Sequence, residues 1–305
     1  MSDESDRRRA ARDRDAADLR SHPRVHWHPG RVDGARVRRI VSLVPSLSEA
    51  LVALGLGDRL VGVTEYCVEP PGAFDGLPRL GGTKDADVEA IASCEPDLVL
   101  ANQEENTARV VRRLAQRGID VRVTYPRTVR EGVRLLSELA DLGADATTRS
   151  RILAPVEQAW SAAEARRRPG EGPRVFCPIW RDPWMTIGPE TYIHDLLELS
   201  GGCNVFGRGA PKTVDGAPDP GAGAPRERRY PVVSLEAVEA TQPEVILLPD
   251  EPYAFGSEDA EQLGLLDVPA AKTGRIVPID GSLVSWYGPR IAQAIQVLAA
   301  IFAKP

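Results

Sequence analysis

Apolar runs alternate with helical patterns along most of this 305-residue chain. The stretch RRIVSLVP, which begins at Arg38, has no polar alternation, so it predicts a strand that is buried on both faces. The next stretch, PSLSEALVALG, predicts a helix with Ser46 as its N-cap, Glu49 as the second member of a capping box, and Gly55 or Gly57 at its end. The stretches VEAIASCEPDLVLA and RVVRRLAQRGIDVRVTYP repeat the order of helix, turn and buried strand. This alternation predicts a parallel sheet with helical crossovers.

The rhythm changes between residues 128 and 168, where no strand pattern occurs. Apolar residues recur there at helical spacing, and about 40 helical residues would reach ~60 Å. We therefore predict one long spine helix between two lobes, kinked or restarted at Pro155, because proline cannot donate the helical hydrogen bond. Two separate packed helices are the alternative. Strand and helix patterns resume with RVFCPIW and continue to the closing helix PRIAQAIQVLAAIFAK.

Two segments of the chain repeat one another. Residues 88–100, VEAIASCEPDLVL, match residues 235–247, LEAVEATQPEVIL, at an offset of 147 residues. Each predicts a helix, a turn with an acidic residue after proline, and a buried strand that runs into an acidic turn. A repeat on both sides of a helical spine predicts two similar lobes with a ligand cleft between them.

Composition and charge narrow the possible functions. The net charge is −6 and the pI about 5.4, which argues against a general nucleic-acid binder, since that needs a basic face. No stretch is long and apolar enough for a membrane span. Residues 1–37 have mixed charge and lack the apolar core of a signal peptide, so we expect a disordered polar tail and, as the sequence is written, a cytoplasmic protein. The serines after the first strand fit no nucleophile-elbow or P-loop pattern, which favours capping over chemistry.

Metal binding by histidine or cysteine is not indicated. No cysteine pair has CxxC spacing, and His194 is the only histidine outside the tail. His22, His26 and His28 could chelate a metal, but a solvated tail is favoured. We predict no cofactor and no bound structural metal.

Aromatic and polar residues gather where the predicted strands end. In open α/β sheets, ligands bind outside the carboxyl ends of the strands, and aromatic side chains there suit a bulky, flat or multi-ring ligand. Only 5% of the chain is aromatic, so this concentration indicates a binding site. The candidate ligand-binding residues at these ends are Tyr66, Asn102, Glu104, Glu105, Trp180, Arg181, Trp184, Glu251, Tyr253, Trp286, Tyr287 and Arg290.

Several of these residues allow two interpretations. Arg181, flanked by two tryptophans, suits an anionic, ring-bearing ligand through charge and cation–π contact, or it pairs with Asp182. Glu104 and its neighbour bind a cation or the polar edge of a ligand, or they form a solvated turn. Together with Glu251 they offer oxygen ligands to a bare metal. Arg290 faces the ligand or caps a neighbouring turn.

Five stretches of the chain together resemble the helical-backbone metal receptor family. They are RRIVSLVPSLSE, VEAIASCEPDLVLA, the spine pattern, SGGCNVF and SLEAVEATQPEVILLP, and the resemblance covers about residues 38–303. Members of this family are the substrate-binding proteins of ABC importers for cobalamin, haem and iron–siderophore complexes. The resemblance implies an α/β fold of two Rossmann-like lobes with parallel sheets, joined by one long spine helix, with the ligand cleft between the lobes. The implied boundaries are a tail at 1–37, lobes at 38–126 and 171–305, and a spine at 127–170.

The resemblance also assigns roles to single residues. It implies that Glu89 and Glu236 dock onto an ABC permease, although both also suit a helix N-terminus through the helix dipole. Tyr66 and Tyr230 match aromatic ligand contacts of cobalamin-binding relatives, and Trp184 lies near another. Two further tryptophans of those relatives are replaced, one of them by Asn102, and Lys84 adds polarity to the expected cleft.

The sequence thus predicts a non-enzymatic, monomeric binding protein for a corrinoid such as cobalamin, or for a chelated metal such as an iron–siderophore or haem. It resembles the binding component of an ABC importer without a signal peptide, and it would be extracytoplasmic if its true start lies elsewhere. The alternatives are a cytosolic enzyme, with Glu104, Glu105 and Glu251 as acid–base groups, and a cytosolic sensor or scaffold.

Overall fold

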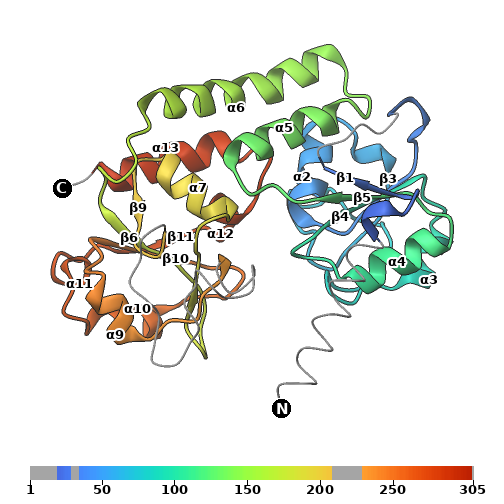
Figure 1. The fold of residues 1–305 in the computed structure, drawn as a ribbon. Coiled ribbons are helices and arrows are strands. Elements are labelled where there is room, and N and C mark those ends of the chain that lie inside the picture. The colour runs from blue at the N-terminus through green and yellow to red at the C-terminus, as the bar shows by residue number, and fades with distance from the viewer. Residues whose placement is uncertain (1–18, 29–33, 208–228, 304–305) are drawn as a thin grey trace. The chain divides into compact units, whose positions relative to one another are not determined.

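The chain divides into two units, each built around its own parallel sheet (Figure 1). The computed structural model describes residues 19–28, 34–207 and 229–303. Unit 1 comprises Met1–Pro126 and Arg134–Leu153, and unit 2 comprises Arg127–Val133 and Ala154–Pro305. The α/β class and the parallel sheets predicted from the sequence are confirmed.

The sheet of unit 1 has five parallel strands in the order β1-β5-β4-β2-β3. They are β1 (Val25–Trp27), β2 (Ile40–Ser42), β3 (Leu60–Val63), β4 (Leu98–Asn102) and β5 (Val121–Thr124). The helices are α2 (Pro45–Ala53), α3 (Val88–Ser93) and α4 (Ala108–Gln116), with 3₁₀ turns η1 (Gly34–Arg36) and η2 (Gly57–Arg59). As predicted, every residue of β2 is buried.

Alternate side chains of the unit 1 strands pack on opposite faces of the sheet. Helices α3 and α4 cover one face, where Val121 and Val123 of β5 join their core (Figure 1). The intervening residue, Arg122, is 1% exposed and hydrogen-bonds Glu138 of helix α5 (Val129–Ala140). A guanidinium inside an otherwise apolar sheet needs this partner, because an unpaired buried charge is costly.

Helix α2 begins two residues earlier than predicted. Its N-cap is Val44, which makes no side-chain cap, and Pro45 takes the first helical position, where its missing N–H costs nothing. Ser46 is therefore not the cap: it is buried inside the first turn, and Ser48 donates its hydroxyl to the Val44 carbonyl. The predicted end is correct, since Gly55, with φ +72°, follows the last turn in a Schellman arrangement.

Part of the expected disordered tail is an ordered edge of the sheet. Strand β1 pairs in parallel with β5, and Leu19 and Val25 belong to the buried core of unit 1. The buried surface of Leu19, Val25 and the partly buried Trp27 stabilises this segment. The charged residues around them obscured this apolar pattern in the sequence. The tail's first 18 residues lie outside the described part of the chain.

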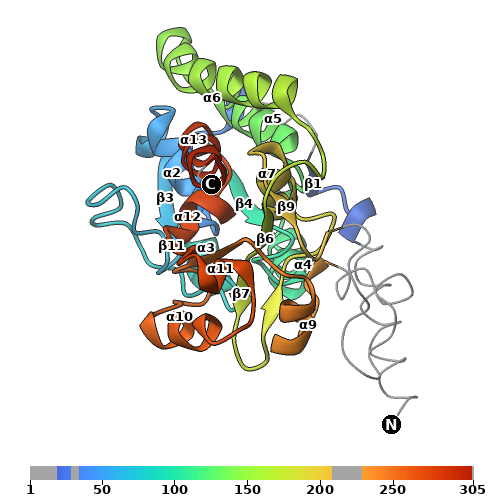
Figure 2. The same cartoon turned by 90° about the vertical axis from the view of Figure 1, so that its left-hand side faces the viewer.

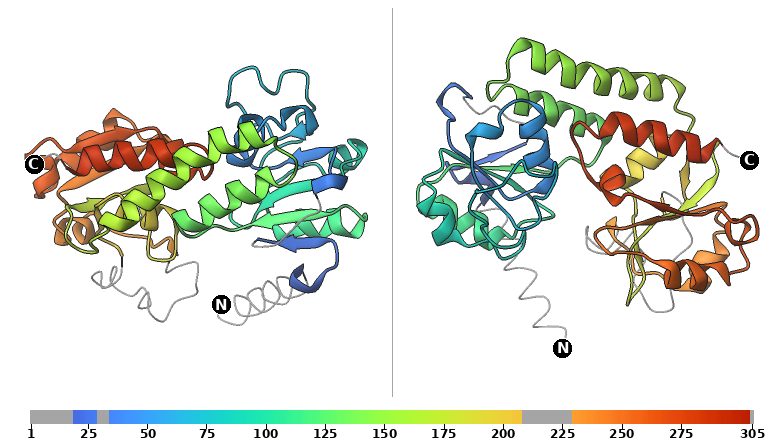
Figure 3. Two further views of the ribbon diagram at one scale, coloured as in Figure 1. Left: turned by 90° about the horizontal axis from the view of Figure 1, so that it is seen from above. Right: turned by 180° about the vertical axis from the view of Figure 1, so that it is seen from behind.

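The expected spine consists of two helices (Figures 1 and 3). They are α5 (Val129–Ala140) and α6 (Ala146–Arg166), so the prediction of one continuous helix is wrong and the alternative of two helices holds. The break falls at Gly143, whose φ of +129° suits only glycine, and a Cβ there would lie 2.6 Å from the guanidinium of Arg59. Pro155 lies inside α6 without ending it. Within α6, the chain passes from unit 1 to unit 2 between Leu153 and Ala154.

Unit 2 repeats the plan of unit 1. Its parallel strands run in the order β11-β10-β6-β9, with α7 and α13 on one face and α9, α10 and α11 on the other (Figure 2). A short antiparallel pair, β7 with β8, follows β6. The elements are β6 (Arg174–Phe176), β7 (Pro178–Trp180), β8 (Met185–Thr186), α7 (Tyr192–Leu199), β9 (Cys203–Asn204), α9 (Leu235–Ala240), β10 (Val245–Pro249), α10 (Ser257–Gly264), α11 (Pro269–Lys272), β11 (Ile276–Ile279), α12 (Gly281–Ser285) and α13 (Ile291–Phe302).

The sequence repeat is a repeat of structure, down to single residues. Helix α3 and strand β4 correspond position by position to α9 and β10. Glu95 and Gln242 occupy the same place in the intervening turn, and both have positive φ, 44° and 49°. Asp97 and Glu244 follow, and each accepts a backbone N–H from the start of the neighbouring strand, β2 or β6. The acidic residue after proline thus has the same role in both copies of the repeat, where it holds two neighbouring strands in register.

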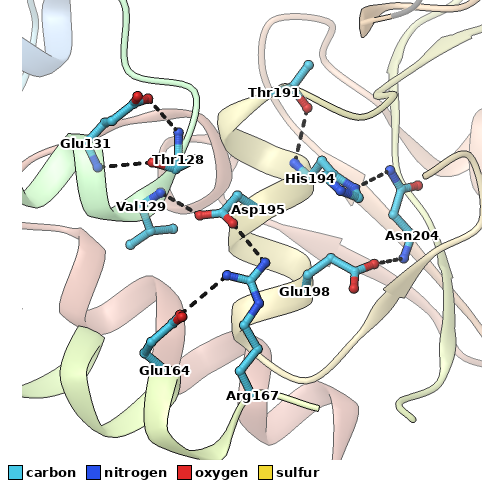
Figure 4. Close-up of polar contacts among 10 residues, drawn as sticks. All are labelled: Thr128, Val129, Glu131, Glu164, Arg167, Thr191, His194, Asp195, Glu198 and Asn204. Atoms are coloured by element: carbon cyan, nitrogen blue, oxygen red, sulfur yellow. Dashed lines mark hydrogen bonds and ion pairs between the residues drawn. The ribbon is translucent and has the colours of Figure 1, made fainter. Parts of the chain in front are cut away.

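One carboxylate in unit 2 fastens three segments together (Figure 4). Asp195 of α7 accepts a hydrogen bond from the backbone N–H of Val129 at 2.7 Å and another from Arg167 at 2.9 Å. It thereby caps the start of α5 and holds the chain that leaves α6. Arg167 also contacts Glu164 at 3.4 Å, but that carboxylate is half exposed.

Replacing Asp195 by alanine is expected to lower the free energy of unfolding of unit 2 by about 1–3 kcal/mol. It removes two hydrogen bonds to a charged acceptor and leaves Arg167 without its better-buried partner. The matched control, Glu164→Ala, removes only the exposed partner, and less than about 1 kcal/mol should be lost. Urea unfolding of both variants measures the difference, and equal losses would refute this role of Asp195.

Candidate functional site

The carboxyl edge of the unit 1 sheet presents one large exposed aromatic side chain. Tyr66 follows β3 and is 60% exposed, and its ring lies against Gly82. Lys84 and Glu104 are exposed near the same edge, and the Lys84 ammonium hydrogen-bonds the backbone carbonyl of Glu104. This contact joins the loop before α3 to the loop after β4. Tyr66 is therefore available to a ligand, with a lysine and a glutamate on neighbouring loops.

Asn102 has a structural role, contrary to its assignment as a ligand contact. The residue is 1% exposed. Its carbonyl oxygen accepts the backbone N–H groups of Glu104 at 2.7 Å and Glu105 at 3.3 Å, and its amide donates to Thr124. The side chain thus folds the turn that follows β4. Asn102 therefore shapes the loop at this edge, and Glu104 is an exposed residue of this loop.

The start of α2 is a feature of this edge that the sequence pattern did not reveal. Ser46 lies in the first turn of this helix and is 3% exposed.

The carboxyl edge of the unit 2 sheet carries a chain of four aromatic rings. Trp180, at the end of β7, is 44% exposed and meets Tyr253 edge to face, with ring centroids 5.7 Å apart. Tyr253 contacts Phe255 at 4.7 Å, and Phe255 stacks on the buried Trp184 at 5.8 Å. Only Trp180 of the four is strongly exposed, so the other three hold it in place. Phe255 was not predicted as part of the site, because no pattern in the loop after β10 marked it.

Arg181 is held within the protein. Its guanidinium hydrogen-bonds Asp259, a buried residue that also caps the start of α10, and it lies 5.7 Å from the ring of Trp184. The hydrogen bond to Asp259 raises the pKa of Arg181. The expected clamp for an anionic ligand is therefore already neutralised, and the alternative partner, Asp182, is not the one used. Asp259 lies 78 residues away along the chain, so no local pattern could have indicated it.

Glu251 forms a second polar cluster at this edge, beyond the end of β10. Its carboxylate accepts the hydroxyl of Ser285 at 2.7 Å and a hydrogen bond from the Trp286 side chain. Burial raises the pKa of Glu251, and the nearby carboxylates Asp250 and Asp280 raise it further against these hydrogen bonds. A Cβ at Gly281 would lie 2.3 Å from the Glu251 side chain, so this approach requires glycine.

Glu251→Gln is expected to raise the melting temperature more at pH 8 than at pH 4. A carboxyl whose folded pKa is raised binds its proton more tightly in the native state, so its ionisation destabilises the fold as pH rises from the unfolded value of 4.5 through the folded value. Glutamine removes this loss and keeps the shape. Thermal unfolding at both pH values measures it, with Glu258→Gln on the exposed surface of α10 as the charge control. A larger gain at pH 4 would contradict the sign.

The remaining candidates of unit 2 are held by intramolecular contacts. Tyr287 is 9% exposed and packs edge to face on Tyr192, with centroids 5.4 Å apart. Arg290 stacks on Trp286 at 5.0 Å and contacts Asp280 at 3.6 Å. Tyr230 is half-buried under Arg229. Of these, Trp286 lies beside Glu251, whereas Tyr287 belongs to the core.

The two glutamates expected to dock a permease differ in their surroundings. Both lie in the first turn of a short helix. Glu89 contacts Arg113 at 3.5 Å and hydrogen-bonds Arg117 of α4. Glu236 has no ion pair within the ranges that the structure describes, and hydrogen bonds from its own backbone N–H and from Ser234 lower its pKa. The two glutamates therefore occupy equivalent positions in the repeat, but among the described residues only Glu89 has arginine partners.

Two further observations concern the described residues as a whole. No group of three histidine, cysteine, aspartate or glutamate side chains among them could hold a metal ion. Within those same ranges, His26 contacts Asp120 and His28 lies 3.7 Å from Glu138, so the tail histidines do not converge. No helix in the part of the chain that the structure covers is long and apolar enough to cross a membrane.

Comparison with known proteins gives a consistent picture. A family model described as periplasmic binding protein matches residues 40–283. The vitamin B12-binding protein of Vibrio cholerae is 28% identical over 218 residues, which is 72% of each chain, and that of Vibrio vulnificus is 24% identical over 90% of this chain and 93% of its own.

Two solved structures extend the likeness to the fold. The apo form of the periplasmic heme-binding protein RhuT from Roseiflexus sp. RS-1 matches with a TM-score of 0.69 and 27% identity over 87% of this chain and 98% of its own. The periplasmic vitamin B12 binding protein BtuF of Vibrio cholerae matches with a TM-score of 0.70 and 25% identity over 87% and 96%.

Proposed function

Because this chain belongs to the periplasmic binding protein family, we propose that it is the ligand-binding component of an ABC importer for a corrinoid or a chelated metal such as haem or an iron–siderophore. Its relatives from two Vibrio species are named for vitamin B12 and its relative from Roseiflexus for heme, which supports a macrocyclic ligand. The chain is a binding protein and not an enzyme, as its family is.

The observation that carries this proposal is the position of the exposed aromatic side chains. Among the residues with described burial, only Tyr66 and Trp180 are aromatic and more than a third exposed. Tyr66 follows the carboxyl end of β3 in unit 1, and Trp180 is the last residue of β7, the short strand that follows β6 in unit 2. Open α/β sheets bind their ligands beyond the carboxyl ends of their strands. A flat ligand with π-faces gains from stacking on such rings, so each of the two side chains is a candidate ligand contact. The predicted cleft between the lobes stays a prediction.

The proposed importer role includes the two docking glutamates. Two carboxylates at repeat-related positions suit a partner with two-fold symmetry. Since Arg117 already binds Glu89, we expect Glu236 to contribute more to docking. The predicted monomer and its single ligand are part of the same proposal. A cytosolic sensor or scaffold has no observation of its own in its favour.

The compartment follows from the proposed role. The binding protein of an importer meets its ligand outside the cytoplasmic membrane, and RhuT and BtuF are both periplasmic proteins. We therefore replace the expected cytoplasmic location by an extracytoplasmic one. Cell fractionation with an antibody against the native protein tests this, and recovery with a cytoplasmic marker enzyme would speak against it.

The ligand class is tested on protein purified from the organism that makes it. We expect an absorption spectrum of a corrinoid or an iron chelate, with cobalt or iron near one atom per chain. Titration of the ligand-free protein with cyanocobalamin, hemin and a ferric siderophore should then quench tryptophan fluorescence with at least one of them. A protein that is colourless and binds none of the three would refute the proposal.

A further inference from the structure

The turn that carries Tyr66 is anchored by a buried residue on each side. Thr64 and Cys67 are fully buried, whereas Tyr66 between them is strongly exposed. The backbone N–H of Cys67 donates to the Thr64 carbonyl at 3.2 Å and closes the turn. The Cys67 sulfur also lies 3.1 Å from the hydroxyl oxygen of Ser48 in α2. The backbone on both sides of Tyr66 is therefore attached to the core of unit 1.

A single arginine joins the two ends of this turn. Arg79 lies in the segment that runs back beside β3, where it forms a parallel bridge with Val63. Its Nη1 atom donates to the Thr64 carbonyl at 3.2 Å and to the Cys67 carbonyl at 2.7 Å. Hydrogen bonds from a charged donor are stronger than those from a neutral one. One guanidinium nitrogen thus holds the carbonyl groups that flank Tyr66.

The residues that follow Arg79 support the Tyr66 ring itself. A Cβ on Gly82 would lie 3.5 Å from this ring, so the ring rests against the Gly82 backbone. The backbone N–H of Glu65 donates to the Gly81 carbonyl at 3.1 Å, which ties the same segment to the turn. Residues 79–82 therefore contact both the backbone and the ring of Tyr66.

We propose that Arg79 is a positioning residue for ligand binding, which acts by holding the Tyr66 turn in its binding conformation before the ligand arrives. This inference rests on the proposed function, in which Tyr66 is a candidate ligand contact. An exposed ring on a loose turn must be ordered when a ligand stacks on it, and that ordering reduces affinity. A turn that is already held by Arg79 avoids most of this loss.

The first test is the affinity of two Arg79 variants of the full-length protein. Arg79→Met should weaken the binding of cyanocobalamin or hemin, whichever the wild type binds more tightly, by about three- to tenfold. Arg79→Lys should retain most of the affinity, because one ammonium group can donate to both carbonyl groups as Nη1 does. Isothermal titration measures both variants. Wild-type affinity in Arg79→Met would overturn the inference.

A double-mutant cycle shows whether Arg79 acts through Tyr66. In the Tyr66→Ala background no ring remains to be positioned, so Arg79→Met should change the affinity by less than about twofold. If the loss in this background is as large as in the wild type, Arg79 acts by another route and the inference is wrong.

The matched control is Arg59→Met. Arg59 also donates from one guanidinium nitrogen to two backbone carbonyl groups of unit 1, those of Val37 and Leu142. The substitution removes the same kind of contact away from the Tyr66 turn, so the affinity should equal that of the wild type. Equal weakening by Arg59→Met and Arg79→Met would indicate a general loss of stability and would contradict a positioning role.

A measurement without ligand separates this inference from the proposed function. The backbone order parameter of the Tyr66 amide should fall from the rigid value of about 0.85 in Arg79→Met, and Arg59→Met should leave it unchanged. If the wild type binds cyanocobalamin or hemin while Arg79→Met alters neither affinity nor order parameter, only the role of Arg79 is wrong. If the wild type binds neither, the proposed function is wrong, and the inference falls with it.

Discussion

Replacing Arg122 by methionine is expected to lower the free energy of unfolding of unit 1 by about 3–5 kcal/mol. Arg122 lies inside the sheet with 2% of its side chain exposed, and its partner Glu138 is 14% exposed. Methionine fills much of the same space but leaves the Glu138 carboxylate buried without its main counter-charge. Burial already lowers the pKa of Arg122, which shows that the protein provides little solvation for charge there.

Two further variants separate charge from packing. In the double variant Arg122→Met, Glu138→Leu no buried charge remains, so most of the loss should be recovered. Arg134→Met removes a second arginine ion pair of Glu138, at 2.9 Å, but Arg134 is 61% exposed, and less than about 1 kcal/mol should be lost. Hydrogen exchange of β4 and β5 in urea measures each loss. A loss below about 1 kcal/mol for Arg122→Met would contradict this account of the core.

Replacing Trp180 by alanine is expected to weaken ligand binding by about 10–100-fold, the range of a central aromatic anchor. The indole is exposed, yet Tyr253 holds it edge to face at 5.7 Å, so little freedom is lost when a ligand stacks on it. Trp180→Phe should retain most of the affinity, because a flat ring remains. Fluorescence of bound ligand or isothermal titration gives the ratio.

The control for Trp180 lies in the same unit. Leu265 follows α10 and is 87% exposed, so Leu265→Ala removes exposed apolar surface without touching the aromatic chain. Its affinity for the ligand should equal that of the wild type. If Trp180→Ala binds as tightly as Leu265→Ala does, the exposed tryptophan is not a ligand contact.

The fold was predictable where the same signal occurred twice. Two helix–turn–strand segments of identical length lie 147 residues apart in the sequence. In the structure their helices and strands begin and end at equivalent positions, with a positive φ at Glu95 and Gln242. The spine was wrongly predicted as one helix because the sequence contains two residues that can break a helix, Gly143 and Pro155. Gly143 ends α5 through a backbone conformation fixed by a distant contact with Arg59, whereas Pro155 is accommodated within α6. The sequence shows Gly143 and Pro155, but it does not show that Arg59 lies against Gly143.

The candidate site was predictable in its location but less in its details. Strand ends located Tyr66, which follows β3, and Trp180, the last residue of β7, since an aromatic residue at the end of a strand pattern is a local signal. The hydrogen-bond partners of Arg181 and Glu251 lie 78 and 34 residues away along the chain, so these hydrogen bonds depend on tertiary structure. Asn102 was assigned to the ligand because a polar residue at a strand end suits either a ligand or a turn, and only burial distinguishes them.

Equilibrium dialysis of the full-length protein against a corrinoid tests the central claim most directly. We predict that cyanocobalamin binds at one molecule per chain, and that the combined variant Tyr66→Ala, Trp180→Ala loses this binding while its circular dichroism stays that of the wild type. No retained corrinoid at a protein concentration of about 10 μM, where micromolar affinity would be evident, would contradict the corrinoid claim. Equal retention by the wild type and the combined variant would show that the ligand binds elsewhere.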